Sequence, residues 1–266
     1  AKIKNMAYEN PIISNAGLDI YEDPIKDRTY VCTVDVARGV SKDYSAFVIM
    51  DVSQMPFKIV AKFRNNEIRP LLFPHTIEKV CKAYNHAHVL VETNDLGQQI
   101  AEALQFELEY DNLLMTTQRG RAGQILGAGF SGRGSGFGVK MTKQIKKIGC
   151  ANIKTLIESD KVLINDFNII EEMSTFIRKG QSWQADEGST DDLMMCLVIF
   201  GWLSNQPFFK EMTDTNARQQ LYEEQQNLIE QDMSPFGFVD DGIPDYEKPE
   251  IDEYGTVWHP VTRKGN

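Results

Sequence analysis

The chain has 266 residues, of which 42% are hydrophobic and 25% are charged, as is typical of a soluble globular protein. It contains no apolar run close to the roughly 18–20 residues that a membrane span requires, so we expect no membrane partner. The formal net charge of −10 argues against a nucleic-acid-binding surface spread over the whole chain, but the charge is distributed unevenly.

The charged residues separate along the sequence into a basic stretch and an acidic end. Residues 113–154 contain eight basic and no acidic side chains, whereas residues 211–253 contain thirteen acidic and two basic ones. We therefore expect a basic working face in a chain that is acidic on average. The four cysteines are far apart and form no CxxC pair, which predicts reduced thiols and a cytosolic compartment.

Sequence periodicity divides the chain into three parts. Residues 1–28 show little periodicity and are expected to form an N-terminal arm or linker. Residues 29–210 alternate between predicted strands and helices and are expected to form one α/β domain. Residues 211–266 are expected to form an acidic C-terminal helix and tail, rich in proline after Ser234.

Within the central part, apolar and β-branched residues predict three strands joined by short connections, which favours an antiparallel meander. A helix with apolar residues at helical spacing and a short apolar strand then follow. The expected strands cover residues 29–36, 44–52, 57–65 and 88–91. Three antiparallel strands, a helix and a parallel strand is the order of a ribonuclease H-like sheet, which places the first and fourth strands side by side.

Further strands are predicted at 112–117 and 161–166, and helices from about 141 to 158 and from 168 to 176. A small hairpin is expected to turn at Lys179-Gly180. A strongly apolar helix follows, for which Ser189 or Thr190 is the expected N-cap.

Carboxylates occur where apolar elements would exclude them. Asp35 interrupts the first buried strand, Glu92 ends the fourth, and Asp191-Asp192 open the apolar helix. A lone carboxylate on a core strand costs several kcal/mol unless a cation or hydrogen-bond donor compensates it. Asp35 and Glu92 would be neighbours on adjacent strands, and the helix could bring the aspartate pair to the same point.

A bound divalent cation is one explanation for such a cluster, because clustered carboxylates repel one another and burial raises their pKa values. Mg²⁺ or Mn²⁺ fits an all-oxygen ligand set better than zinc, since no Cys or His joins it. Two such ions about 4 Å apart can promote in-line phosphoryl displacement. The alternatives are that Asp35 is a satisfied structural residue and that the aspartate pair stabilises a helix dipole.

Three segments also resemble a known family: "VDVARGVSKDYSAFVI", "VLVETNDLGQQIAEAL" and "EGSTDDLMMCLVIFGWL". They are similar to the nuclease domain of the large terminase subunit (DNA-packaging motor) of large contractile-tailed bacteriophages, over residues from about Thr29 to Phe209. The resemblance implies an α/β, ribonuclease H-like (resolvase/integrase-type) mixed sheet flanked by helices. It also implies a metal-dependent endonuclease of the host cytoplasm that cuts double-stranded concatemeric viral DNA with little sequence specificity.

The resemblance implies roles for individual carboxylates. Asp35 matches the first metal ligand and Glu92 the second, while the third is one of Asp191 and Asp192, with a slight preference for Asp192. Asp43 matches a further acidic position and is equally well explained as a turn residue. Mg²⁺ or Mn²⁺, as two ions, is the expected cofactor.

The basic, glycine-rich stretch is the expected binding surface for the DNA backbone, because glycine permits close approach and basic side chains pair with phosphates. Lys143, Lys146 and Lys147 share one helical face. The full set of expected DNA-binding residues is Arg119, Arg121, Arg133, Lys140, Lys143, Lys146 and Lys147.

The family's packaging ATPase has no counterpart in this sequence, because no G-x-x-x-x-G-K-[ST] motif occurs and "GRGSGFGVK" lacks its Lys-Ser/Thr ending. The resemblance implies the portal and the small terminase subunit as partners. Two other functions stay open: a resolvase-like nuclease acting on branched DNA, and a non-catalytic domain that docks on the portal or capsid.

Overall fold

The computed structural model describes residues 6–37, 44–119, 123–127, 135–180, 182–214, 250–251 and 257–258. The chain divides into two units, Ala1–Gln220 and Leu221–Asn266. In the second unit, β13 (Glu250–Ile251) pairs antiparallel with β14 (Val257–Trp258). Among the described residues, no helix combines the length and apolarity needed to cross a membrane.

The first unit is built on a mixed, seven-stranded sheet. Six of its strands follow the order β1-β2-β5-β4-β3-β6, and the seventh, β10, pairs with β5. The β3–β6 and β10–β5 pairs are parallel and the other pairs are antiparallel. The strands are β1 (Ile13–Asn15), β2 (Leu18–Ile20), β3 (Tyr30–Asp35), β4 (Ser45–Asp51), β5 (Phe57–Asn65), β6 (His88–Val91) and β10 (Val162–Leu163). This confirms the predicted meander and the predicted neighbourhood of the first and fourth strands.

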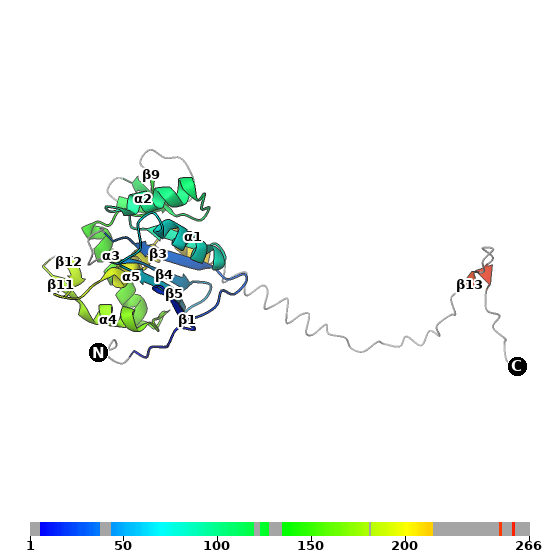
Figure 1. Ribbon diagram of the computed structural model, residues 1–266, viewed down its shortest axis with the longest axis horizontal. Coiled ribbons are helices and arrows are strands. Elements are labelled where there is room, and N and C mark those ends of the chain that lie inside the picture. Colours follow the sequence, from blue (N-terminus) through cyan, green and yellow to red (C-terminus); the bar gives the residue numbers. More distant parts are fainter. Residues whose placement is uncertain are drawn as a thin grey trace. The chain divides into compact units, whose positions relative to one another are not determined.

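Helices cover both faces of the sheet, giving three layers (Figure 1). One face packs against α1 (Phe73–Ala83) and α2 (Gly97–Glu102), which continues as a π-helical turn, η2 (Ala103–Glu107). The other face packs against α3 (Lys143–Glu158), α4 (Phe167–Thr175) and α5 (Asp192–Leu203).

The alternation of side chains along the strands decides which face receives the carboxylates. In β3, Val31 packs on the α3–α5 side and Cys32 on the α1–α2 side. In β6, Leu90 packs on the α3–α5 side. Asp35 and Glu92 follow Val31 and Leu90 at even spacing, so both lie on the face that α5 covers.

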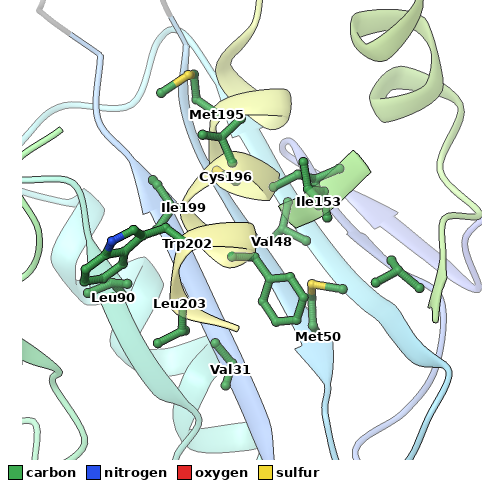
Figure 2. Close-up of a cluster of buried hydrophobic side chains, with 14 of the residues drawn as sticks. Val31, Val48, Met50, Leu90, Ile153, Met195, Cys196, Ile199, Trp202 and Leu203 are labelled. Atoms are coloured by element: carbon green, nitrogen blue, oxygen red, sulfur yellow. The ribbon is translucent and has the colours of Figure 1, made fainter. Parts of the chain in front are cut away.

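Helix α5 is the central element of that face. All of its residues from Leu193 to Leu203 are buried, as expected for a helix that is apolar all round. Figure 2 shows Trp202 of α5 lying over Leu90 of β6, whereas Ile153 of α3 lies on the other side of α5, and all three belong to one buried cluster. This contact fixes where the helix starts relative to the ends of β3 and β6.

Helices α3 and α5 approach closely because glycines face each other at their crossing. A methyl group added at Gly149 would lie 2.2 Å from the carbonyl oxygen of Val198. One added at Gly201 would lie 2.4 Å from the carbonyl oxygen of Gly149. No side chain larger than hydrogen fits these positions without moving a backbone.

Two short segments differ from the sequence-based expectations. The expected arm contains β1 and β2, and β2 pairs with β5 at the edge of the sheet. The expected strand 112–117 and the glycine-rich stretch after it form a separate sheet with the order β8-β7-β9. Its strands are β7 (Met115–Arg119), β8 (Gly123–Gly127) and β9 (Ser135–Phe137).

The predicted hairpin is confirmed. Strands β11 (Phe176–Lys179) and β12 (Ser182–Ala185) pair antiparallel, and Gly180 at the turn has a φ of 62°. This left-handed conformation favours glycine because it has no Cβ atom. The hairpin leads directly into the residues that precede α5.

Candidate metal-binding active site

A pocket of about 360 Å³ opens at the ends of β3 and β6 beside the start of α5. Five carboxylates line it, and they come from three separate parts of the sequence. Four of them, Asp35, Glu92, Asp191 and Asp192, were predicted as metal ligands, and the fifth, Asp95, was not. The structure thus brings together all four of the predicted metal-ligand residues that it describes; Asp43 lies outside the described residues.

The pairing of β3 and β6 places Asp35 beside Glu92. Val34 pairs with Val91 in parallel register, and the Glu92 amide donates to the Val34 carbonyl at 2.9 Å. Burial raises the pKa of Asp35 well above its usual value, and the charges of Glu92, Asp192 and Asp191 and a side-chain hydrogen bond with Glu92 add to the effect. Asp35 is therefore a carboxyl group whose ionisation requires a compensating positive charge.

Asn94 holds Glu92 in place, a role that the sequence-based prediction missed. Its Nδ2 donates to Glu92 Oε1 at 3.0 Å and to the Met141 carbonyl, just before α3, at 3.2 Å. The loop is compact because a Cβ at Gly97 would lie 1.7 Å from the Glu92 carbonyl oxygen. The segment "ETNDLG" thus folds back on Glu92. Its Asn and Gly are the features of the sequence from which this loop could have been predicted.

The start of α5 presents the aspartate pair differently from the prediction. The N-cap residue is Asp191, not Ser189 or Thr190, and its side chain makes no capping hydrogen bond. Asp191 Oδ2 accepts from the Ala185 amide at 3.2 Å and lies 4.0 Å from Lys146 Nζ. The Asp191 side chain therefore does not cap its own helix.

Asp192 combines an incompletely hydrogen-bonded carboxylate with a raised pKa. Its Oδ1 accepts from the Tyr44 amide at 3.3 Å, while its buried Oδ2 has no hydrogen-bond partner among the described residues. Burial, followed by the charge of Glu172, raises the pKa of Asp192 to about 7, although Arg64 opposes the shift. An unsatisfied buried carboxylate oxygen is costly, and a bound cation would compensate it.

The residues present fit a hard divalent cation. The donors that line the pocket are carboxylate and amide oxygens, with no Cys or His among them, and this set suits Mg²⁺ or Mn²⁺. Among the described residues, no three His, Cys, Asp or Glu side chains already form a coordination set.

The predicted DNA-binding residues that the structure describes differ in their exposure. Lys146 lines the carboxylate pocket, whereas Lys140, Lys143 and Lys147 are exposed. Gln124 fixes the backbone of Lys140 through two hydrogen bonds, at 2.8 and 2.7 Å. Arg121, Arg133 and the side chain of Arg119 lie outside the described residues.

A mixed sheet of this order, with carboxylates from its first and fourth strands and a covering helix, defines the ribonuclease H-like class. Residues 32–199 match the family model described as the terminase RNaseH-like domain, and the chain belongs to this family. This confirms both the expected family and the expected fold.

Solved structures of similar fold come from large terminases. The large terminase nuclease of thermophilic phage G20c with bound magnesium is 19% identical, with a TM-score of 0.57 over 76% of this chain and 94% of that chain. The same nuclease with bound cobalt is 20% identical, with a TM-score of 0.56 over 76% and 94%. The nuclease domain of the Thermus phage P74-26 large terminase is 20% identical, with a TM-score of 0.54 over 75% and 91%.

Proposed function

We propose that this chain is a divalent-metal-dependent endonuclease that cuts double-stranded DNA during the packaging of a phage genome. The observation that carries the proposal is the convergence of Asp35, Glu92, Asp191 and Asp192 on one pocket. Membership of the terminase RNaseH-like family supports it. So do the nucleases of similar fold whose structures contain magnesium or cobalt.

In this proposal Asp35, Glu92 and Asp192 hold the cofactor, two Mg²⁺ or Mn²⁺ ions. The unsatisfied Oδ2 of Asp192 favours this residue over Asp191, whose Oδ2 already accepts from Ala185. The bound ions would stabilise the charge that develops when a phosphodiester is displaced. The carboxylates would hold the ions in place, and Asn94 keeps Glu92 directed into the pocket.

Exposed lysines of α3 and the basic stretch before it would bind the phosphate backbone. Such contacts position DNA without reading its sequence, so we expect weak sequence preference and strong dependence on salt. Residues 29–210 would be the nuclease domain and 211–266 a tail attached to it. The portal, the small terminase subunit and a packaging ATPase domain would be its partners in the host cytoplasm.

Plasmid cleavage tests the proposal directly. The chain is incubated with supercoiled plasmid and Mg²⁺, Mn²⁺ or EDTA, beside the Asp35→Asn variant. We expect metal-dependent nicking and linearisation that the variant loses, while the variant binds DNA at least as tightly because a charge that repels phosphate is gone. Equal activity in both chains would show that the carboxylate pocket is not the site.

A further inference from the structure

The start of α5 is capped by a side chain from another helix. Glu172 of α4 has only 3% of its surface exposed, and its Oε2 accepts from the amide of Met194, in the first turn of α5, at 2.9 Å. Its Oε1 accepts from the Thr190 hydroxyl at 3.2 Å. Glu172 thus supplies the anionic cap that Asp191 does not provide.

Arg64 of β5 completes this arrangement on the other side. Its Nη2 donates to Thr190 Oγ1 at 2.6 Å and lies 3.5 Å from Glu172 Oε1. The Thr190 hydroxyl therefore accepts from a cation and donates to an anion. Both charged side chains are largely buried, with 19% and 4% of their surfaces exposed.

The same arginine also holds the strand end that contacts Asp192. Its guanidinium carbon lies 4.1 Å from the ring centroid of Tyr44, a cation–π contact. The Tyr44 amide donates to Asp192 Oδ1 at 3.3 Å. Arg64 of β5 therefore contacts Thr190 directly. It is also linked to Asp192 through Tyr44, the residue before β4.

We propose that Glu172 and Arg64 are positioning residues that fix the first turn of α5, so that Asp191 and Asp192 direct their carboxylates into the pocket rather than onto their own helix. This inference rests on the proposed function, because it concerns how the same site is held for metal binding. Neither residue lines the pocket, so they position Asp191 and Asp192 through the backbone of 190–194 and through Tyr44, in addition to the direct effect of their charges on Asp192.

Glu172 competes with the aspartates for the amides at the start of α5. An aspartate at a helix start normally accepts from the amides of its own first turn. Here the Met194 amide is already occupied by Glu172, so the aspartates lose their local partner. A buried Glu–Arg pair contributes little net stability, and an apolar pair of similar size would often stabilise the fold as well or better. A role at the neighbouring site accounts for the position of this pair.

The experiment compares Mn²⁺ binding to the intact chain and three variants by isothermal titration calorimetry, with plasmid cleavage measured in parallel. Glu172→Ala removes the cap. Glu172→Gln keeps one acceptor for the Met194 amide. Ile157→Ala, near the far end of α3, is a matched core variant that lowers stability without touching α5's first turn.

We expect Glu172→Ala to bind Mn²⁺ at least about 10-fold more weakly, the usual effect of losing a group that orients metal ligands. Glu172→Gln should recover most of that affinity, and Ile157→Ala should bind like the wild type. Wild-type affinity in Glu172→Ala, or an equal loss in Ile157→Ala, would overturn the positioning role while leaving the proposed function intact. A wild-type chain that neither binds Mn²⁺ nor cuts plasmid would overturn both.

Discussion

The charged side chains that line the pocket are mostly acidic. Lys146 is the single cation among the pocket-lining residues that the structure describes, and five carboxylates line the same space. Its Nζ lies 4.0 Å from Asp191 and 5.6 Å from the ring centroid of Phe176, so the ammonium group is held at the site. In the proposed nuclease, Lys146 would contact the phosphate that is cut.

Lys146→Ala should therefore slow cleavage by about 100-fold, the usual cost of one group that stabilises transition-state charge. DNA affinity should change little, because one phosphate contact among several is lost. Single-turnover cleavage and filter binding measure the two effects separately. The matched control is Lys147→Ala, which removes an exposed lysine one position along α3. Equal cleavage rates in the two variants would place Lys146 among the general backbone contacts.

The carboxylates of the site could be predicted from the sequence, whereas the residues that hold them could not. Asp35 and Asp192 contrast with the apolar residues around them, and this contrast is visible in a few residues of sequence. Glu172 lies in "IIEEMST", where nothing distinguishes it from a solvent-exposed helical glutamate. Its role arises from a contact with Met194, 22 residues later, and with Arg64 on a different strand.

At the scale of elements, the main strands could be predicted because burial imposes a regular pattern on them. The segments 57–65 and 88–91 were predicted with the bounds that β5 and β6 have. Strands β1, β2, β8 and β9 were missed, since segments of three to five residues with polar or glycine positions show no alternation. Their pairing depends on the neighbouring strands rather than on their own sequence.

The contact between α3 and α5 yields a prediction about stability. Gly149→Ala should destabilise the fold by about 1–3 kcal/mol, the usual cost of overpacking a core. Alanine gains about 1 kcal/mol of helix propensity over glycine, but the clash with the Val198 carbonyl oxygen involves backbone and cannot be relieved by a rotamer change. Urea denaturation measures the difference in the free energy of unfolding.

Gly136→Ala is the matched control for this prediction, because a Cβ there would meet no atom within 4 Å. We expect its free energy of unfolding to stay within about 0.5 kcal/mol of the wild-type value. If Gly149→Ala were as stable as this control, the two helices would have room that the packing of Gly149 and Gly201 does not show.

At the scale of the whole molecule, the carboxylates of the site lower the free energy of unfolding when no metal is bound. The chain already carries a net charge of −10, and the pocket concentrates five carboxylates beside a buried helix. Burial, followed by the charges of neighbouring carboxylates, raises the pKa values of Asp35 and Asp192, which means that ionising them destabilises the folded chain. A bound cation would reverse this, so metal binding and folding should be thermodynamically linked.

This linkage predicts opposite effects of one substitution with and without metal. In EDTA, Asp35→Asn should raise the free energy of unfolding by about 0.5–2 kcal/mol, because folding no longer has to force protonation of a buried carboxyl that is ionised in the unfolded chain. A domain of this size changes its melting temperature by about 2–4 °C per kcal/mol. In the wild type, Mn²⁺ at 100 times its dissociation constant should add about 2.7 kcal/mol, whereas in Asp35→Asn most of this gain should disappear. Differential scanning calorimetry in EDTA and in Mn²⁺ measures all four values. A variant that is less stable than the wild type in EDTA, yet stabilised equally by Mn²⁺, would show that Asp35 serves the fold and not the metal.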